Sequence, residues 1–409
     1  MWHEKRTTPF RIVQKSYARY KKHGRQGMIE RLHKEYEKIR VSHRNYKLNF
    51  PLNIINPETI TLTQLTHLEV PKFKVPLVSI IIPAYNQANY TYACIETIIK
   101  NTQDVPYEII LMDDKSPNED ARNLEHNIKN ITFVSNEENQ GFLKNCNAGA
   151  SLAKGKYIFL LNNDTNVQPY WLSSLVELIE SDETIGMVGS RLVYPDARQQ
   201  EAGGIVWNDA SGWNLGRLDD PTKPEYNYVK EVDYISGAAI MIKASLWKEI
   251  GGFDERYTPA YYEDTDLAFE VRRHGYKVMY QPRSIVVHFE GISNGTDLGS
   301  GIKKYQVVNH KKFFDKWKEI LESEQYPNAQ DVFKARDRSS KKTHVLFIDH
   351  YIPHYDQDAG SKATFQYLQI LAKSGIQVHF IGDNFWHYPD TPYLEALTQM
   401  GIEVLYGNW

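Results

Sequence analysis

The residues best suited to chemistry follow a short apolar run at 157–161. Asn162, Asn163 and Asp164 come directly after this run. The run predicts a strand buried on both faces, as in a mostly parallel sheet. Ligands of open α/β sheets bind beyond the carboxyl ends of the strands, where a carboxylate and two amides can hold a hard cation and the phosphates that it bridges. The simpler alternative is a turn, because Asn and Asp are turn formers.

Acidic and imidazole side chains recur further along the chain. Glu263, Asp264 and Asp266 lie where a helix is expected to begin, and His288 ends a short predicted strand. Acids in a first turn complement the helix dipole, so capping is the simpler interpretation for Asp266. An adjacent pair of acids exceeds what a cap requires. A lone His at a strand end is most often structural.

Alternating strands and helices must position these residues. Strands are predicted near 78–82, 108–112, 131–134 and 157–161, with helical segments between them. This alternation predicts βαβ units and a Rossmann-like sheet. Further strands are expected at 187–193, 234–242 and 285–288, and helices at 169–181, from about 263 to 275, and at 303–324. Because the first four strands all end in polar residues, these ends should gather on one edge of the sheet.

Composition indicates a soluble, globular chain of more than one domain. With 409 residues, 41% hydrophobic and 24% charged, the chain is too long for one ordinary core and too apolar for disorder. Its apolar runs fall short of the roughly 18 residues that span a bilayer, and it opens without a signal-peptide pattern. We therefore expect a cytoplasmic protein with Cys94 and Cys146 reduced.

The first 50 residues form a basic arm. They carry 14 Lys and Arg against 4 Asp and Glu, a net charge of +10. Because the whole chain has a net charge of −3, the remaining residues have a net charge of −13. Apolar residues recur at helical spacing between residues 10 and 39. Such a helix can lie peripherally on an anionic membrane, here the inner face of the cell membrane; the alternative is a solvated helix packed on the main domain. Nucleic acid is not an expected partner.

Residues 78 to roughly 295 resemble the family 2 glycosyltransferases. The segments that carry the resemblance are Pro83-Ala-Tyr-Asn86, Asp113-Asp114-Lys-Ser116, residues 139–149, Asn162-Asn-Asp164, Glu263-Asp264 and His288. The family consists of inverting enzymes of the GT-A fold that use nucleotide-activated sugars. Residues 344–406 resemble the opening of a family 4-type GT-B glycosyltransferase, with Gly360 and Ser361 in its first loop. About 65 residues make a marginal core, so we expect this unit to be part of a longer one.

The resemblance implies a fold class and four domains. The fold class is α/β, a GT-A (Rossmann-like, nucleotide-diphospho-sugar transferase) domain with an N-terminal helical extension and a partial second Rossmann-like domain. The predicted boundaries are 1–75 for the basic extension and connector, 76–295 for the GT-A domain, 296–342 for a helix and linker, and 343–409 for the GT-B-like fragment.

The resemblance also implies a nucleotide site. Tyr85 would stack on the base, Asp114 would accept a hydrogen bond from base or ribose, and Lys144 with Asn145 lies at a helix start, which favours phosphate. The full predicted set is Pro83, Tyr85, Asn86, Asp113, Asp114, Asn139, Gly141, Lys144, Asn145 and Asn163. UDP and dTDP both fit these residues.

Metal, base and acceptor roles follow from the same resemblance. Asp164 and His288 would hold Mn²⁺ or Mg²⁺, and a His ligand is more natural for Mn²⁺. The family pattern Asp-x-Asp begins here with Asn162, an uncharged residue. Asp264 would be the general base, supported by Glu263. The predicted sugar or acceptor contacts are Gly204, Trp213, Gly237 and Ala238.

The predicted function is therefore metal-dependent, inverting transfer of a hexosyl or deoxyhexosyl group. The donor would be a UDP- or dTDP-sugar, and the acceptor a hydroxyl of a glycan or lipid-linked glycan in bacterial surface polysaccharide synthesis. The alternative, favoured by Asn162, is a non-catalytic sugar-nucleotide-binding module attached to a GT-B transferase. A dehydrogenase is disfavoured, because no Gly-x-Gly-x-x-Gly follows the first strand.

Overall fold

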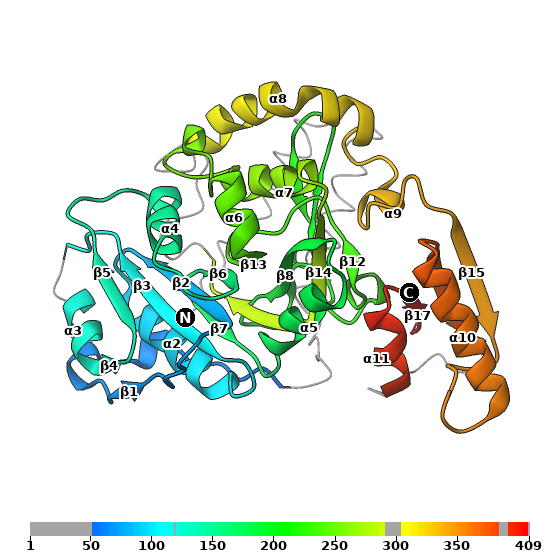
Figure 1. The fold of residues 1–409 in the computed structure, drawn as a ribbon, viewed down its shortest axis with the longest axis horizontal. Coiled ribbons are helices and arrows are strands. Elements are labelled where there is room, and N and C mark those ends of the chain that lie inside the picture. Colours follow the sequence, from blue (N-terminus) through cyan, green and yellow to red (C-terminus); the bar gives the residue numbers. More distant parts are fainter. Residues whose placement is uncertain (1–50, 118–119, 291–303, 384–391, 408–409) are drawn as a thin grey trace, which may run out of the picture.

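The computed structural model describes residues 51–117, 120–290, 304–383 and 392–407. These residues form a large α/β unit and a smaller βα unit, connected through the long helix α8 and the segment after it (Figure 1). The basic arm at 1–50 lies outside the described residues. No helix among those described is long and apolar enough to cross a bilayer. Both cysteines are buried free thiols, as predicted.

A mixed sheet organises the large unit. Its strand order is β12-β14-β8-β13-β6-β2-β3-β5, with β7 paired to β14 and β9 to β8. The strands are β12 (Lys230–Glu231), β14 (Lys277–His288), β8 (Ile185–Val193), β13 (Ala239–Lys243), β6 (Tyr157–Leu161), β2 (Val78–Ala84), β3 (Tyr107–Asp113), β5 (Thr132–Ser135), β7 (Thr165–Val167) and β9 (Gln199–Glu201). Strands β6, β2, β3 and β5 are parallel, as are β8 and β14, while β13 runs antiparallel between β6 and β8. The prediction of a Rossmann-like sheet is confirmed, and the sheet is mixed because β13 runs against its neighbours.

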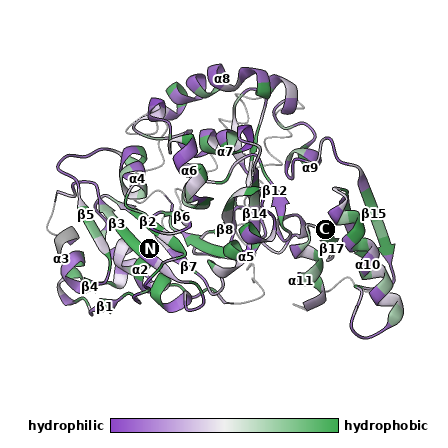
Figure 2. Ribbon diagram, in the orientation of Figure 1, coloured by the Kyte–Doolittle hydropathy of each residue, from purple (hydrophilic) through white to green (hydrophobic). Residues whose placement is uncertain are grey.

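Helices cover both faces of this sheet, which explains the unbroken apolar strands. Ile80 and Ile82 enter one core and Ile81 enters the other, because neighbouring side chains of a strand point to opposite faces. The first face is covered by α2 (Ala88–Asn101), α3 (Asp120–Asn127) and α5 (Ser173–Ser181), and the second by α4 (Phe142–Ala150), α6 (Ala244–Ile250), α7 (Glu263–Arg273) and α8 (Lys304–Glu324). Figure 2 shows the central strands as the most hydrophobic part of this unit.

Short elements complete the large unit. They are the paired strands β1 (Leu68–Glu69) and β4 (Ile128–Lys129), the hairpin of β10 (Gly204–Val206) with β11 (Gly212–Asn214), and the 3-10 turns η1 (Pro57–Thr59), η2 (Leu62–Gln64), η3 (Pro224–Tyr226) and η4 (Glu255–Tyr257). The strand predicted at 234–242 is only partly correct. Residues 234–238 are irregular and β13 begins at Ala239, because the earlier backbone groups bond to side chains and loops outside the sheet.

The smaller unit is a three-stranded parallel sheet of order β15-β16-β17. Its elements are β15 (His344–Asp349), α10 (Ala359–Lys373), β16 (Gln377–Gly382), α11 (Pro392–Gln399) and β17 (Glu403–Leu405), preceded by α9 (Val332–Ala335). The βα order agrees with the sequence, but its GT-B resemblance remains a prediction. The segment expected as a polar linker is instead packed: buried Arg336 pairs with Glu403 at 2.7 Å and with Glu225 at 3.1 Å, joining the two units.

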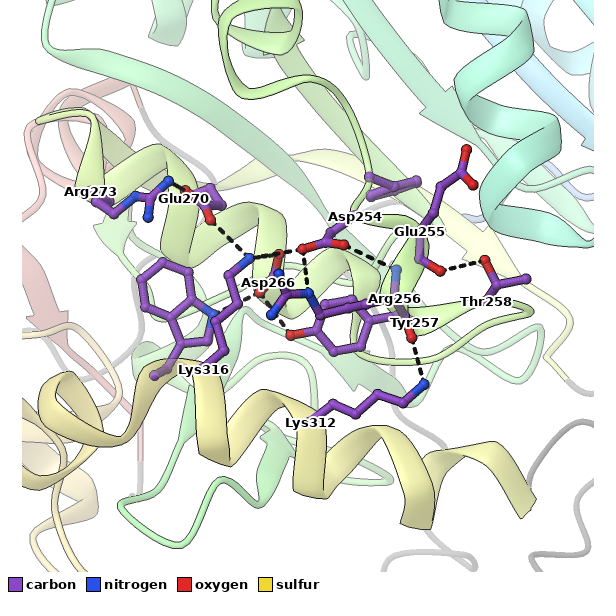
Figure 3. Close-up of polar contacts among 12 residues, drawn as sticks. Asp254, Glu255, Arg256, Tyr257, Thr258, Asp266, Glu270, Arg273, Lys312 and Lys316 are labelled. Carbon is purple, nitrogen blue, oxygen red and sulfur yellow. Dashed lines mark hydrogen bonds and ion pairs between the residues drawn. The ribbon is translucent and has the colours of Figure 1, made fainter.

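Helix α8 is fastened to α7 by buried charge (Figure 3). Asp266 accepts hydrogen bonds from Tyr257 Oη at 2.9 Å and Trp317 Nε1 at 2.7 Å, and pairs with Lys316 Nζ at 2.8 Å. Lys316 also contacts Glu270 at 2.8 Å. Asp266 lies in the first turn of α7, as predicted, but its carboxylate oxygens accept from donors of other elements instead of capping the helix.

Replacing Asp266 should weaken the whole large unit. Asp266→Ala leaves the ammonium of Lys316 and the indole N–H of Trp317 without their common acceptor, and breaking a buried pair in this way costs about 3–5 kcal/mol. Urea unfolding should show this loss. Asp315→Ala, which removes an exposed carboxylate of α8, is the control and should change the free energy of unfolding by less than about 0.5 kcal/mol. Equal stabilities of the two variants would contradict the role of Asp266.

Candidate active site

Residues 236–238 bring three parts of the chain together at the end of β6. The backbone N–H of residue 236 donates to Glu201 Oε1 at 2.9 Å, and that of residue 237 donates to Asp264 Oδ2 at 2.9 Å. The carbonyl of residue 238 accepts from the N–H of Asn162 at 3.0 Å. The start of the Asn162–Asp164 segment and the acidic pair of α7 therefore lie against the same three residues. Two of these, Gly237 and Ala238, were predicted to contact the sugar or acceptor.

Asp164 and His288 meet as a buried pair. Strand β7, which follows Asp164, pairs antiparallel with the end of β14 so that Thr165 is opposite His288. His288 Nε2 lies 3.2 Å from Asp164 Oδ1 and 3.5 Å from Asn162 Nδ2. Burial lowers the pKa of His288, but the charge and hydrogen bond of Asp164, together with the charges of Glu290 and Glu201, outweigh burial and hold the pKa above its ordinary value. The two predicted metal ligands are thus adjacent.

The donor atoms at this place suit a hard or borderline divalent cation. A carboxylate oxygen, an imidazole nitrogen and an amide side chain are typical Mn²⁺ and Mg²⁺ surroundings, and such ions often take their other ligands from substrate phosphates and water. Within the described residues there is no group of three or more His, Cys, Asp or Glu placed to hold a metal. Asn163 does not face this pair, since its Nδ2 donates to Thr91 Oγ1 at 3.0 Å.

The acidic pair opens α7 after a strained turn. Tyr261 and Tyr262 both have positive φ, +76° and +75°, a conformation that costs a non-glycine residue on the order of 1–3 kcal/mol. Asn309 of α8 holds this turn, because its Nδ2 donates to the carbonyls of residues 257, 260 and 261 at 2.7–3.1 Å. The structure therefore fixes the direction in which Glu263 and Asp264 leave the helix start.

The two acids have different surroundings. Asp264 accepts from two backbone N–H groups, those of Gly237 and Thr265, at 2.9 and 2.7 Å, yet burial still raises its pKa. Glu263 is more deeply buried, and burial together with the charge of Asp264 raises its pKa well above the ordinary value. None of the described residues hydrogen-bonds to Glu263 Oε2. Asp264, which is partly exposed, is the better placed of the two to exchange a proton with a ligand.

Four residues near Asp264 and His288 were not identified from the sequence. Glu201 and Gln200 lie on β9, Arg217 in the loop after β11, and Glu290 just beyond β14. Glu201 is fully buried, and burial, followed by the charge of Asp264, raises its pKa to about 8. Its Oε2 has no partner among the described residues. No periodic or motif signal marks these positions, since β9 is three residues long.

The predicted nucleotide residues line the ends of β2 and β3. Asp113 accepts from Ser116 Oγ at 2.5 Å and from Ser135 Oγ at 2.7 Å, and it lines a small pocket with Asn86 and Ser116. The backbone N–H of Asn86 donates to Ser116 Oγ at 2.8 Å. Next to this pocket in sequence, Tyr85 is 42% exposed, whereas Pro83 is buried within β2.

Asp114 shapes the loop that leads into α4. Its carboxylate accepts from the N–H groups of Gln140 and Gly141 at 2.7 and 2.8 Å and from Asn136 Nδ2 at 2.8 Å. Gly141 has φ +79°, and a Cβ there would lie 3.2 Å from Pro259. Three donors from the loop therefore occupy the carboxylate that was predicted to receive base or ribose.

The other predicted residues of this loop differ in exposure. Asn139 donates to the carbonyl of Asp114 at 3.2 Å. Asn145 is buried and donates to the carbonyl of Met112 at 3.0 Å, so its amide supports the sheet end. Lys144, in the first turn of α4, is partly exposed with its Nζ 3.7 Å from Glu255. Of these side chains, only that of Lys144 carries a charge that an incoming phosphate would meet.

Two predicted acceptor residues occupy a neighbouring hairpin. Gly204 is buried in β10, and a Cβ there would lie 2.1 Å from the ring of Tyr234, so this glycine serves close packing. Trp213 of β11 is 37% exposed and meets Trp207 edge to face at 5.0 Å between ring centroids. Trp213 therefore offers an aromatic surface, while Gly204 offers no exposed one.

Comparison with known proteins agrees with this architecture. Residues 79–249 match the family described as "Glycosyl transferase family 2". The chain is 29% identical over 234 residues to the protein y4gI of Sinorhizobium fredii, covering 54% of this chain and 25% of that protein. It is 24% identical over 230 residues to the O-antigen biosynthesis protein RfbC of Myxococcus xanthus, covering 54% of this chain and 18% of RfbC. The chain thus spans a quarter or less of these two relatives.

A crystal structure of GalNAc-T7 with UDP, GalNAc and Mn²⁺ is similar at a TM-score of 0.48 and 18% identity, covering 66% of this chain and 55% of that one. The segment that matches the family runs from β2 to α6 of the large unit. The strand order and the helices on both faces confirm the predicted α/β, Rossmann-like fold of this unit.

Stability should depend on pH through Glu201. At low pH its carboxyl is neutral in both states; as pH rises from 4.5 to about 8 the unfolded chain loses this proton while the folded protein keeps it, so folding stability is lost over this range. Glu201→Gln lacks that loss. In EDTA, the free energy of unfolding of the variant minus that of wild type should increase by on the order of a few kcal/mol as the pH is raised over this range. Exposed Glu183→Gln is the control; parallel curves for Glu201→Gln and wild type would refute the assignment.

Proposed function

We propose that this chain is a metal-dependent, inverting glycosyltransferase. It moves a hexosyl or deoxyhexosyl group from a UDP- or dTDP-sugar to a hydroxyl of a glycan or lipid-linked glycan. The observation that carries the proposal is that residues 236–238 contact both Asn162 and Asp264, which places the Asp164–His288 pair and a partly exposed carboxylate at one end of the sheet. The match of residues 79–249 to glycosyl transferase family 2 supports it.

The residues have separate parts in the proposed reaction. Mn²⁺ or Mg²⁺, held by Asp164 and His288, would neutralise charge on the departing nucleoside diphosphate. Asp264 accepts the proton of the acceptor hydroxyl while the hydroxyl oxygen bonds to the anomeric carbon of the donor sugar. The bond from that carbon to the diphosphate oxygen breaks on the opposite face, which inverts the configuration. Burial and the charge of Asp264 raise the pKa of Glu263 well above its ordinary value, so Asp264 is the better acceptor of the proton.

The nucleotide would lie along the ends of β2 and β3. The base would lie over the ends of these two strands, beside Asp113 and Asn86 and against the exposed ring of Tyr85, and the start of α4 with Lys144 would face the phosphates. Trp213 offers an aromatic face for a sugar ring. A role in surface polysaccharide synthesis is supported by the similarity to RfbC, whose name refers to O-antigen. A peripheral membrane role for residues 1–50 remains a prediction.

One observation favours a second function. Asn162 stands where the family has an acid, and its amide lies 3.5 Å from His288, so the cation would meet a single carboxylate here. A module that binds the sugar nucleotide without turning it over would fit this reduced charge. Metal-dependent binding of UDP or dTDP without transfer, over a broad panel of donors and acceptors, would support this alternative.

Asp264→Asn tests the proposed base. The amide keeps the shape of the side chain but cannot accept the proton, so transfer should fall by about 10²–10⁴-fold. Donor affinity, measured by calorimetry, should stay near that of wild type. Asp315→Asn on the exposed side of α8 is the control and should transfer normally. Full activity of Asp264→Asn would exclude this residue as the base.

Metal removal tests the proposed cation. Transfer should disappear in EDTA and return with added Mn²⁺, because the leaving diphosphate then regains its counter-charge. Asp164→Ala should not recover at Mn²⁺ concentrations that restore wild type, since it removes the carboxylate ligand of the pair. Transfer that continues unchanged in EDTA would contradict a metal-dependent mechanism.

A further inference from the structure

We propose that Gln200 is a positioning residue that fixes which ring nitrogen of His288 faces Asp164, and that Glu290 sets the orientation of the Gln200 amide. This inference rests on the metal site of the proposed function. It concerns two side chains that neither the motifs nor the family match assign a role. The first of them, Gln200, contacts both His288 and Glu290.

Glu290 is surrounded by donors. Arg217 Nη2 lies 3.0 Å from both of its carboxylate oxygens, and Tyr194 Oη donates to Oε2 at 2.8 Å. Gln200 Nε2 reaches the same Oε2 at 3.1 Å. A carboxylate paired with a guanidinium only accepts hydrogen bonds. Glu290 therefore requires a donor from Gln200.

This requirement fixes the Gln200 amide. The opposite orientation would put the amide oxygen 3.1 Å from a carboxylate oxygen with no proton between them. With the amide nitrogen turned to Glu290, the amide oxygen faces His288 Nδ1 at 3.2 Å. Gln200 is only 2% exposed, so water has little access to replace either contact. Nδ1 of His288 must then carry a proton whether the ring holds one proton or two.

The consequence reaches the other side of the imidazole. With one proton held on Nδ1 by Gln200, any second proton of the ring lies on Nε2, between the ring and Asp164 3.2 Å away, and a ring with a single proton has its lone pair on Nε2. Nε2 is then available as a metal ligand beside the carboxylate. Partners that hold the second nitrogen of a ligating His raise metal affinity by about 10–100-fold. Gln200 would act in this way without touching the cation.

The fold explains why these residues meet. Strand β9 pairs with β8, and β8 is the parallel neighbour of β14, so Gln200 lies beside the end of β14, where His288 and Glu290 follow. The loop that carries Arg217 is tied to the same strand: Leu218 N–H donates to the carbonyl of Gln199 at 2.8 Å. Arg217, Glu290 and Gln200 are therefore held by backbone pairing.

Mn²⁺ binding by the full chain tests the inference. Free Mn²⁺ would be counted by electron paramagnetic resonance near neutral pH, with Mn²⁺ alone and with Mn²⁺ plus UDP or dTDP. Gln200→Leu removes the acceptor at Nδ1 and should weaken Mn²⁺ binding about 10–100-fold. In Gln200→Glu, a proton shared between the new carboxyl group and Glu290 replaces the amide donor, and the other carboxyl oxygen still accepts from His288 Nδ1. This variant should bind Mn²⁺ within a few-fold of wild type. Glu290→Gln, which lets the amide turn, should fall between wild type and Gln200→Leu.

Controls separate positioning from folding. Gln330→Leu, an exposed position, should bind Mn²⁺ as wild type does. If the variants are ranked by their unfolding temperatures in EDTA, this ranking should differ from their ranking by Mn²⁺ affinity. Wild-type affinity in Gln200→Leu, or equal weakening in Gln200→Leu and Gln200→Glu, would overturn this inference and leave the proposed function intact. Wild-type protein that binds no Mn²⁺ in any arm would overturn the metal assignment and this inference together.

Discussion

Four carboxyl groups share one buried region of this molecule, and dehydration of their charge is the constraint on which the site depends. Asp164, Glu201 and Glu263 are each at most 6% exposed, and Asp264 is partly exposed. Buried carboxylates are costly unless they are paired, hydrogen-bonded or protonated. The structure uses all three: His288 pairs with Asp164, backbone N–H groups hold Asp264, and burial raises the pKa values of Glu201 and Glu263, which favours their protonated forms. Such a concentration of perturbed groups is typical of functional sites.

Helix α8 supports the part of the site that carries Glu263 and Asp264. Helix α8 binds α7 through Asp266 and holds the preceding turn through Asn309. Two tyrosines with left-handed backbone lie in this turn. Packing and buried hydrogen bonds in α8 therefore stabilise a conformation that the local sequence disfavours, and that conformation sets where Glu263 and Asp264 begin their helix.

The smaller unit depends on the larger one for part of its stability. Among its described residues, the buried cluster contains seven hydrophobic side chains, a small core for three strands and two helices. Arg336 joins Glu403 of this unit to Glu225 of the large unit, and His379 contacts the same Glu403 at 2.7 Å. Arg336 meets both carboxylates only when the two units are together. The interface thus fixes their relative position.

Local patterns in the sequence determined the strands, their polar ends and the acidic pair. A run such as residues 157–161 specifies a doubly buried strand by its own composition, and the position of Asn162 and Asp164 follows from the end of that strand. The antiparallel pairing of β7 with β14, which brings His288 beside Asp164, was decided by the tertiary structure. The tertiary structure alone decided which oxygen and nitrogen atoms meet. Gln200, Glu201, Arg217 and Glu290 come from a three-residue strand and from loops without periodicity, and Asp266 faces α8 instead of its own helix end. Their partners depend on strand register and helix packing over long sequence separations, which no local pattern encodes.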